Sequence, residues 1–198
     1  MKKQKPVLII GINGSPRKGG TTTMMLKKVL KSIRDHGGQT KLIHLIENNI
    51  KPCLGCYSTN PKLCTFPCRQ KDDMEKIYPL LLKADGIVLG TPSYWFSPSG
   101  LMKNFIERLT SLENNGYLLE GKAVGFVAAA EESGGDEAIM VLVETMNAMG
   151  LITPPYSTIF YSTKYKNKWA LKDCELLGKN MMQICRIFRK VKPNWGYD

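Results

Sequence analysis

The hydrophobic positions of this chain alternate between strand-like runs and helical spacing. Continuous apolar runs are typical of strands that are buried on both faces of a sheet. Such runs predict five strands, at residues 7–12, 40–46, 86–90, 123–130 and 156–161. Between them, apolar residues recur every three or four positions, which is the spacing of one buried helix face. This spacing predicts five helices, with buried faces at residues 25–33, 74–82, 101–109, 139–149 and 171–187.

The order of these elements predicts the fold class. Strands that alternate with helices form parallel, doubly wound sheets. We therefore expect an α/β fold, a three-layer α/β/α sandwich around a five-stranded parallel sheet. No repeat, low-complexity segment or linker interrupts the 198 residues. One domain is expected over residues 1–198, with a cysteine-rich loop insertion at residues 50–70 and Asp72 as the cap of the next helix.

Three loops follow the carboxyl ends of predicted strands, at residues 13–23, 91–98 and 130–135. In open parallel sheets, ligands bind beyond these strand ends, at the point where the strand order reverses. The same three loops are rich in glycine, polar or aromatic residues. We therefore expect the binding site at the sheet edge that these loops share.

The first of these loops has the features of an anion site. The start of a helix offers free backbone N–H groups and the positive end of the helix dipole. Serine and threonine add hydroxyl groups, and arginine adds charge and several N–H donors. The candidates for binding a phosphate monoester are Ser15, Arg17, Gly20, Thr21, Thr22 and Thr23. Neither the Walker A nor the Gly-x-Gly-x-x-Gly pattern occurs here, and a helix cap without a ligand is the alternative.

Three consecutive aromatic residues mark the second loop. They cannot all face one core from the end of a strand, so some should be exposed or should cover a flat ligand. Backbone N–H groups in this loop can bond the carbonyl and nitrogen atoms of a ring. The candidates are Pro92, Ser93, Tyr94, Trp95 and Phe96. A packed loop or an oligomer contact is the alternative.

Four cysteines lie within the loop insertion, as Cys-x2-Cys-x7-Cys-x3-Cys. They are Cys53, Cys56, Cys64 and Cys68. Four thiolates within 16 residues can bind a [4Fe–4S] cluster or tetrahedral zinc, and free thiols are the third interpretation. The basic start of the chain is more typical of a capped first strand than of a signal peptide, because no cleavage site follows. We therefore expect a cytoplasmic protein without disulfides.

The net charge of +11 restricts the partners. It indicates a solvated basic surface or the steering of anionic ligands such as NADPH. Nucleic acid is not expected as a partner, because aromatic residues do not interleave with the basic ones as they do on a base-stacking surface. A membrane is not expected either, because no apolar run approaches the roughly 20 residues that span a bilayer.

Three motifs together resemble a known family. They are Gly-Ser-Pro-Arg-Lys-x-Gly-x-Thr at residues 14–22, Thr-Pro-Ser-Tyr-Trp at 91–95 and Leu-Met-Lys-Asn-Phe-Ile-Glu-Arg at 101–108. Over about residues 6–150 the chain resembles the NADPH-dependent FMN reductases and, more narrowly, their iron–sulfur flavoprotein branch. That branch usually carries Cys-x2-Cys-x2-Cys, whereas Thr59 stands at the third position here.

The resemblance implies a flavodoxin-like fold with FMN at the carboxyl edge of the sheet. It implies that the phosphate is held by Ser15, Arg17 and Thr21 to Thr23, and that the isoalloxazine is bordered by Pro92 to Phe96. The third loop would flank the flavin through Glu131, Ser133, Gly134 and Gly135. The two acids in this loop depart from the small, glycine-rich sequence usual in the family.

The implied function is an NAD(P)H oxidoreductase that passes electrons through FMN to a small acceptor, such as a flavin or quinone. The flavin carries the chemistry, so no catalytic acid or base is expected from the protein. Two alternatives stay open. One is an iron–sulfur flavoprotein or flavodoxin-like electron carrier between redox proteins. The other is a regulatory module that senses a nucleotide. We also expect a homodimer or homotetramer.

Overall fold

The computed structural model describes residues 5–191 and 193–196. Most of the basic start of the chain therefore lies outside the described residues. Five parallel strands form the sheet in the order β2-β1-β3-β5-β6. They are β1 (Leu8–Asn13), β2 (Gln39–His44), β3 (Gly86–Tyr94), β5 (Ala123–Ala130) and β6 (Thr158–Ser162). The predicted α/β class and the five parallel strands are confirmed, but the described sheet has a sixth strand, the short β4 (Ser97–Pro98), which pairs with β3.

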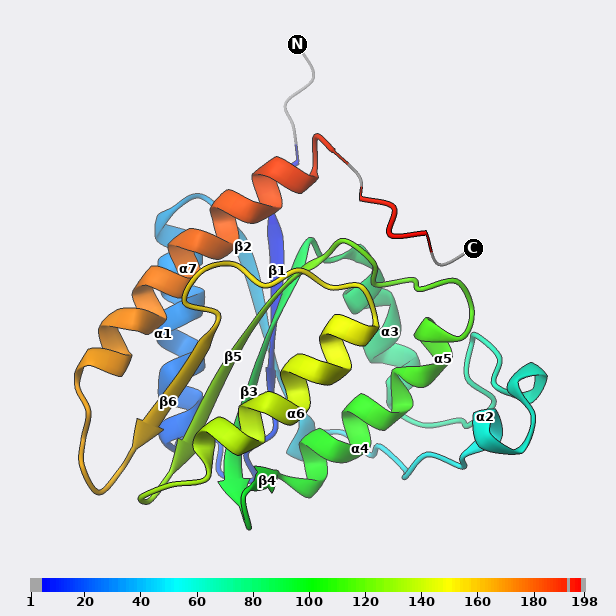
Figure 1. The fold of residues 1–198 in the computed structure, drawn as a ribbon, viewed down its shortest axis with the longest axis horizontal. Helices are drawn as coiled ribbons and strands as arrows, with labels where there is room; N and C mark the ends of the chain where they lie inside the picture. Colours follow the sequence, from blue (N-terminus) through cyan, green and yellow to red (C-terminus); the bar gives the residue numbers. More distant parts are fainter. Residues whose placement is uncertain (1–4, 192, 197–198) are drawn as a thin grey trace.

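Helices cover both faces of this sheet (Figure 1). One face carries α1 (Thr21–Asp35) and α7 (Trp169–Phe188). The other carries α3 (Met74–Lys83), α4 (Gly100–Arg108) and α6 (Gly135–Ala148). Short helical turns complete the chain: η1 (Leu45–Glu47), α2 (Cys56–Thr59), η2 (Pro61–Leu63) and α5 (Thr110–Glu113). None of the helices among the described residues is both long enough and apolar enough to cross a bilayer.

Alternating strand residues divide the core into two layers. Ile9 and Val88 pack with Leu26 of α1 and Leu177 of α7. Their neighbours along the strands face the opposite helices; one of them, Ile10, belongs to the second layer. This two-sided burial explains the continuous apolar runs in the sequence, since a strand exposed on one face would alternate with polar residues.

The second binding loop differs from the expectation of an irregular segment. Residues 91–94 continue β3, and the two-residue strand β4 (Ser97–Pro98) pairs antiparallel with its end. Trp95 and Phe96 form the turn between them, with φ values of 51° and 59°. Two positive φ values characterise a type I′ hairpin turn, for which Asn-Gly is the usual sequence. The hairpin was not predicted, because its turn residues are Trp95 and Phe96 rather than Asn-Gly.

Gly135, the first residue of α6, packs against a ring. A Cβ at this position would lie 2.6 Å from Phe160 Cγ and closer still to two other ring atoms. We expect Gly135→Ala to lower the free energy of unfolding by about 1–3 kcal/mol, because the ring must move. Gly100→Ala, at the start of α4, is the matched control, since its Cβ would meet nothing within 4 Å. Equal urea midpoints for the two variants would contradict the packing explanation.

Candidate functional site

The first turn of α1 leaves its backbone donors available. Gly20 is the N-cap, no side chain caps the helix, and the first turn contains no acidic residue. The first N–H groups of a helix have no acceptor within the helix itself. They therefore present a partial positive charge, which favours an anion. Thr21 and Thr22 of this turn line a cavity at the carboxyl edge of the sheet.

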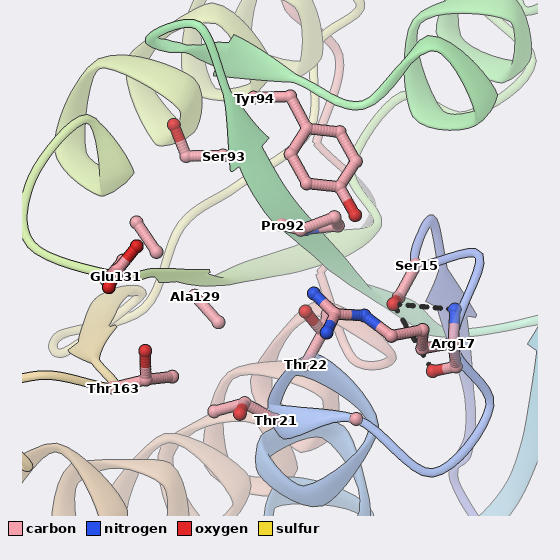
Figure 2. A pocket seen from close by; sticks show the side chains of 12 residues that line it. Ser15, Arg17, Thr21, Thr22, Pro92, Ser93, Tyr94, Ala129, Glu131 and Thr163 are labelled. Carbon is pink, nitrogen blue, oxygen red and sulfur yellow. Dashed lines mark hydrogen bonds between the residues drawn. The ribbon is translucent and has the colours of Figure 1, made fainter.

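Hydrogen bonds between residues close in the sequence shape the loop that leads into α1. Ser15 Oγ accepts a hydrogen bond from the Arg17 amide at 3.1 Å and lies 3.2 Å from the Arg17 carbonyl oxygen. Thr23 Oγ1 donates to the same carbonyl at 3.4 Å. The Arg17 side chain extends into the cavity between the start of α1 and Tyr94 (Figure 2). The fixed backbone thus directs a guanidinium toward the free N–H groups.

Asn13, at the end of β1, supports this loop from beneath. Its side chain is fully buried. Asn13 Oδ1 accepts a hydrogen bond from the Ser15 amide at 3.0 Å. Asn13 Nδ2 donates to Thr23 Oγ1 at 2.9 Å and lies 2.8 Å from Nδ1 of His44. Sequence reasoning missed Asn13, although its place at the end of the first strand was a usable signal.

The cavity has a volume of about 550 Å³, which is within the range of about 300–1,000 Å³ for small-molecule sites. Its lining residues are Ser15, Arg17, Gly20, Thr21, Thr22, Pro92, Ser93, Tyr94, Ala129, Ala130, Glu131 and Thr163. Arg17 is the one cation and Glu131 the one carboxylate in this lining. The three predicted loops do meet at one edge of the sheet, and Thr163 after β6 adds a wall that the sequence did not indicate.

Six other predicted residues do not line this cavity, namely Thr23, Trp95, Phe96, Ser133, Gly134 and Gly135. Thr23 is buried beneath the loop, where it bonds Asn13. Trp95, at the tip of the hairpin, is 93% exposed. Phe96 lies against Gly134, whose φ of 85° suits glycine. Of the two alternatives for the aromatic residues, exposure describes Trp95 and Phe96 in this structure.

The hairpin and the third loop are tied together beside the cavity. Ser93 Oγ donates a hydrogen bond to the Gly134 carbonyl at 2.6 Å. On the far side, Ser162 Oγ donates to the Glu131 carbonyl at 2.6 Å. The loop that carries Glu131 is therefore held from β3 and from β6. The two cavity walls formed by the β3–β4 hairpin and by the loop that carries Glu131 are therefore fixed relative to each other.

All four cysteines of the loop insertion are free and partly buried. Burial raises the pKa of the Cys64 thiol, and the nearby thiols of Cys53, Cys68 and Cys56 raise it further. Cys64 is therefore within electrostatic range of the other three thiols, and the number and chemistry of the four cysteines suit a thiolate-bound metal. Among the described residues, however, no group of three or more His, Cys, Asp or Glu side chains is arranged to hold a metal ion. The sulfurs do not form a closed site in this structure.

A buried ion pair fixes the base of the cysteine loop. The side chains of Arg108 and Asp72 are both 0% exposed and form a salt bridge. Arg108 also donates to the Lys51 carbonyl at 3.0 Å and to Cys68 Sγ at 3.5 Å. Asp72 accepts from the Lys51 amide at 3.0 Å. Both ends of the loop are thus held at one point in the core.

Asp72 also acts at the start of α3. The N-cap position falls on Asp73, one residue later than expected, but Asp72 Oδ1 accepts the Met74 amide at 3.0 Å. Burial opposes ionisation of Asp72, yet hydrogen bonds from Arg108 and from the amides of Lys51 and Met74 hold its pKa below the ordinary value. The carboxylate is therefore stabilised in its charged form.

Comparison with known proteins adds the family. The sequence pattern of the NADPH-dependent FMN reductases matches residues 7–165. The chain belongs to this family. An iron–sulfur flavoprotein of Methanocaldococcus jannaschii is 35% identical to this FMN reductase family member, over 92% of the chain and 99% of the relative. Another, from Archaeoglobus fulgidus, is 31% identical, over 94% and 99%. The resemblance to the iron–sulfur flavoprotein branch is confirmed.

Solved structures confirm the flavodoxin-like fold of this reductase family member. A flavodoxin from the domain Archaea has a TM-score of 0.63 at 16% identity, covering 91% of this chain and 99% of its own. RosB, solved with a bound 8-demethyl-8-formylriboflavin-5'-phosphate intermediate, has a TM-score of 0.78 at 15% identity, covering 94% of this chain and 82% of its own. An NADH:FMN oxidoreductase in its apo form has a TM-score of 0.65 at 22% identity, covering 91% and 89%. The family and the iron–sulfur flavoprotein relatives identify a flavin-dependent oxidoreductase, and the solved structures show its fold.

Proposed function

We propose that this protein binds FMN in the 550 Å³ cavity and passes electrons from NAD(P)H to a small acceptor, such as a flavin or quinone. The observation that carries the proposal is the uncapped start of α1 with Arg17 beside it, at one end of a cavity walled by Pro92 and Tyr94. A phosphate monoester fits the start of α1 beside Arg17, and a flat ring system fits the wall formed by Pro92 and Tyr94.

Each wall of the cavity has a distinct role in this proposal. The amides and hydroxyls of Thr21 and Thr22, with Ser15 and Arg17, bind the phosphate. Pro92 and Tyr94 present apolar surface to the ring and exclude water from it. When bound, FMN supplies hydride acceptance from the nicotinamide and electron delivery to the acceptor. The protein binds and orients FMN, and it needs no catalytic acid or base of its own.

The test is the visible spectrum of protein purified without air, before and after addition of NADPH or NADH. A flavin spectrum that bleaches with either nucleotide supports the reductase. A flavin spectrum that neither nucleotide changes supports an electron carrier between redox proteins. Colourless protein that takes up no added FMN contradicts the proposal.

The cysteine loop supports a second candidate, an iron–sulfur flavoprotein that carries electrons between redox proteins. Two observations favour it: four free cysteines in one loop, and relatives named iron–sulfur flavoproteins. Binding would require the loop to draw its sulfurs together, and zinc or free thiols are the other outcomes. Iron, sulfide and zinc assays on the same purified sample separate the three. Cys64→Ala should abolish any bound iron and leave the flavin content unchanged.

We also propose a homodimer or homotetramer. The exposed side chains of Trp95 and Phe96 beside the cavity support it, because exposed aromatic clusters often mark interfaces. Sedimentation of the purified protein tests this, and a monomer at every concentration would contradict it.

A further inference from the structure

His44, at the end of β2, does not line the cavity. It is hydrogen-bonded to Asn13, the residue that supports the loop between β1 and α1 (residues 14–20, the phosphate loop). We propose that His44 is a positioning residue, which holds the phosphate loop through Asn13 and weakens FMN binding when it is protonated. This inference rests on the proposed function, because it concerns the affinity of the loop for the phosphate of FMN.

The hydrogen bonds of Asn13 fix the direction of the first link. Asn13 Oδ1 accepts from the Ser15 amide, which can only donate. The other end of the amide, Nδ2, must therefore be the group that faces Thr23 Oγ1 and His44 Nδ1. An amide nitrogen only donates, so Nδ1 of His44 accepts and the ring proton is on Nε2. This arrangement requires a neutral imidazole.

Parallel pairing of the first two strands brings these residues together. Asn13 and His44 are direct neighbours across β1 and β2. From this position Asn13 reaches both ends of the phosphate loop: the Ser15 amide at its start, and Thr23 in the first turn of α1. Thr23 in turn contacts the Arg17 carbonyl oxygen. The orientation of one buried amide thus sets the positions of Ser15 and Arg17.

Protonation of His44 removes this arrangement. It places an N–H on Nδ1, opposite the Asn13 amide nitrogen at 2.8 Å, so that two donors face each other. Rotating the Asn13 amide by 180° would give His44 an acceptor. The same rotation would place NH2 opposite the Ser15 amide, which would lose its acceptor. Without the rotation, the part-buried hydrogen bond between Asn13 and His44 is lost; with it, the buried hydrogen bond to the Ser15 amide is lost.

Two groups of opposite charge lie beside His44. Glu47 of η1 and Lys18 of the phosphate loop form an ion pair on the surface. The hydrogen bond from Lys18 lowers the pKa of Glu47, and the charge of His44 contributes to the same shift. A test of His44 must therefore compare variants in which this ion pair is unchanged.

The experiment measures the dissociation constants of FMN and riboflavin at pH 8 and pH 5.5, a range in which histidine changes its charge. His44→Asn offers a carbonyl oxygen where Nδ1 lies and does not titrate, whereas His44→Leu removes the acceptor. Between pH 8 and pH 5.5, the dissociation constant of FMN should rise about five- to tenfold more for the native protein than for His44→Asn. This factor corresponds to the free energy of one hydrogen bond. The phosphate of FMN titrates in both proteins, so it cancels in this comparison.

The controls separate the loop from the fold. His44→Leu should bind FMN weakly at both pH values, and His44→Asn should restore tight binding at pH 8. Riboflavin has no phosphate, so its affinity should not respond to either substitution. Equal loss of FMN affinity in the native protein and in His44→Asn would overturn the inference. If the native protein binds no FMN at pH 8, the proposed function itself fails. If His44→Leu does not fold, the first comparison still decides.

Discussion

Replacing Arg108 with leucine is expected to lower the free energy of unfolding by about 3–5 kcal/mol, the cost of breaking a buried ion pair from one side. The guanidinium is fully buried, and its removal leaves the Asp72 carboxylate without its cation. The Lys51 carbonyl loses its hydrogen bond as well. The loss combines an uncompensated buried charge with an unpaired backbone group, and burial of the leucine offsets only part of it.

Urea unfolding followed by far-UV circular dichroism measures this change. The double variant Arg108→Leu with Asp72→Asn should recover part of the stability, because the buried charge is then absent. Lys103→Ala on the same helix is the control, since its ion pair with Glu107 lies on the surface and should contribute little. A loss of less than about 1 kcal/mol for Arg108→Leu would show that solvent reaches Asp72.

The ion pair also sets a dependence on pH. The folded-state pKa of Asp72 lies below its ordinary value, so its stabilising effect is fully present above the pKa of the unfolded chain. That effect is lost as the pH falls through the lower, folded-state pKa. The native protein should therefore lose more stability on acidification than the double variant without either charge.

Arg17→Ala is expected to weaken FMN binding about 10- to 100-fold, as for the loss of hydrogen bonds from a charged group. Arg17 is the one cation among the residues that line the cavity. Riboflavin binding should change little, because the effect comes from the phosphate. Arg17→Lys should recover only part of the affinity, since an ammonium keeps the charge but not the planar pair of donors.

Titration calorimetry on protein freed of flavin gives both constants. Lys18→Ala is the matched control: it removes the neighbouring cation, which pairs with Glu47 and does not line the cavity. Comparable losses for the two variants would assign the effect to net charge rather than to a contact. A similar loss for riboflavin would mean that Arg17 shapes the ring site.

The features predicted correctly from the sequence are those with local causes. The start of α1 is recognisable because glycine, serine and threonine follow a buried strand. The pairing of Asn13 with His44 was not predictable, because 31 residues separate them and only the strand register joins them. Thr163 likewise follows the last strand at a position that no local signal marks.

The extent of β3 was missed for a related reason. Proline is usually excluded from central strands, so Pro92 indicates a loop when it is considered alone. In the structure it pairs in register with Ala129 of β5 at the carboxyl end of the sheet. Sequence patterns therefore locate the edge where the site lies more reliably than they locate the ends of the strands that form it.

The anchoring of the cysteine loop at Arg108 and Asp72 has an evolutionary consequence. The two ends of the loop are held together at the buried ion pair. A change in loop length therefore alters the free energy of unfolding only through the entropy of loop closure, which varies with the logarithm of the length. Residues between the anchors can be gained, lost or exchanged without rebuilding the sheet edge. The cavity and the thiols of the loop can therefore change independently in evolution. A related chain can retain the cavity and lack the thiols.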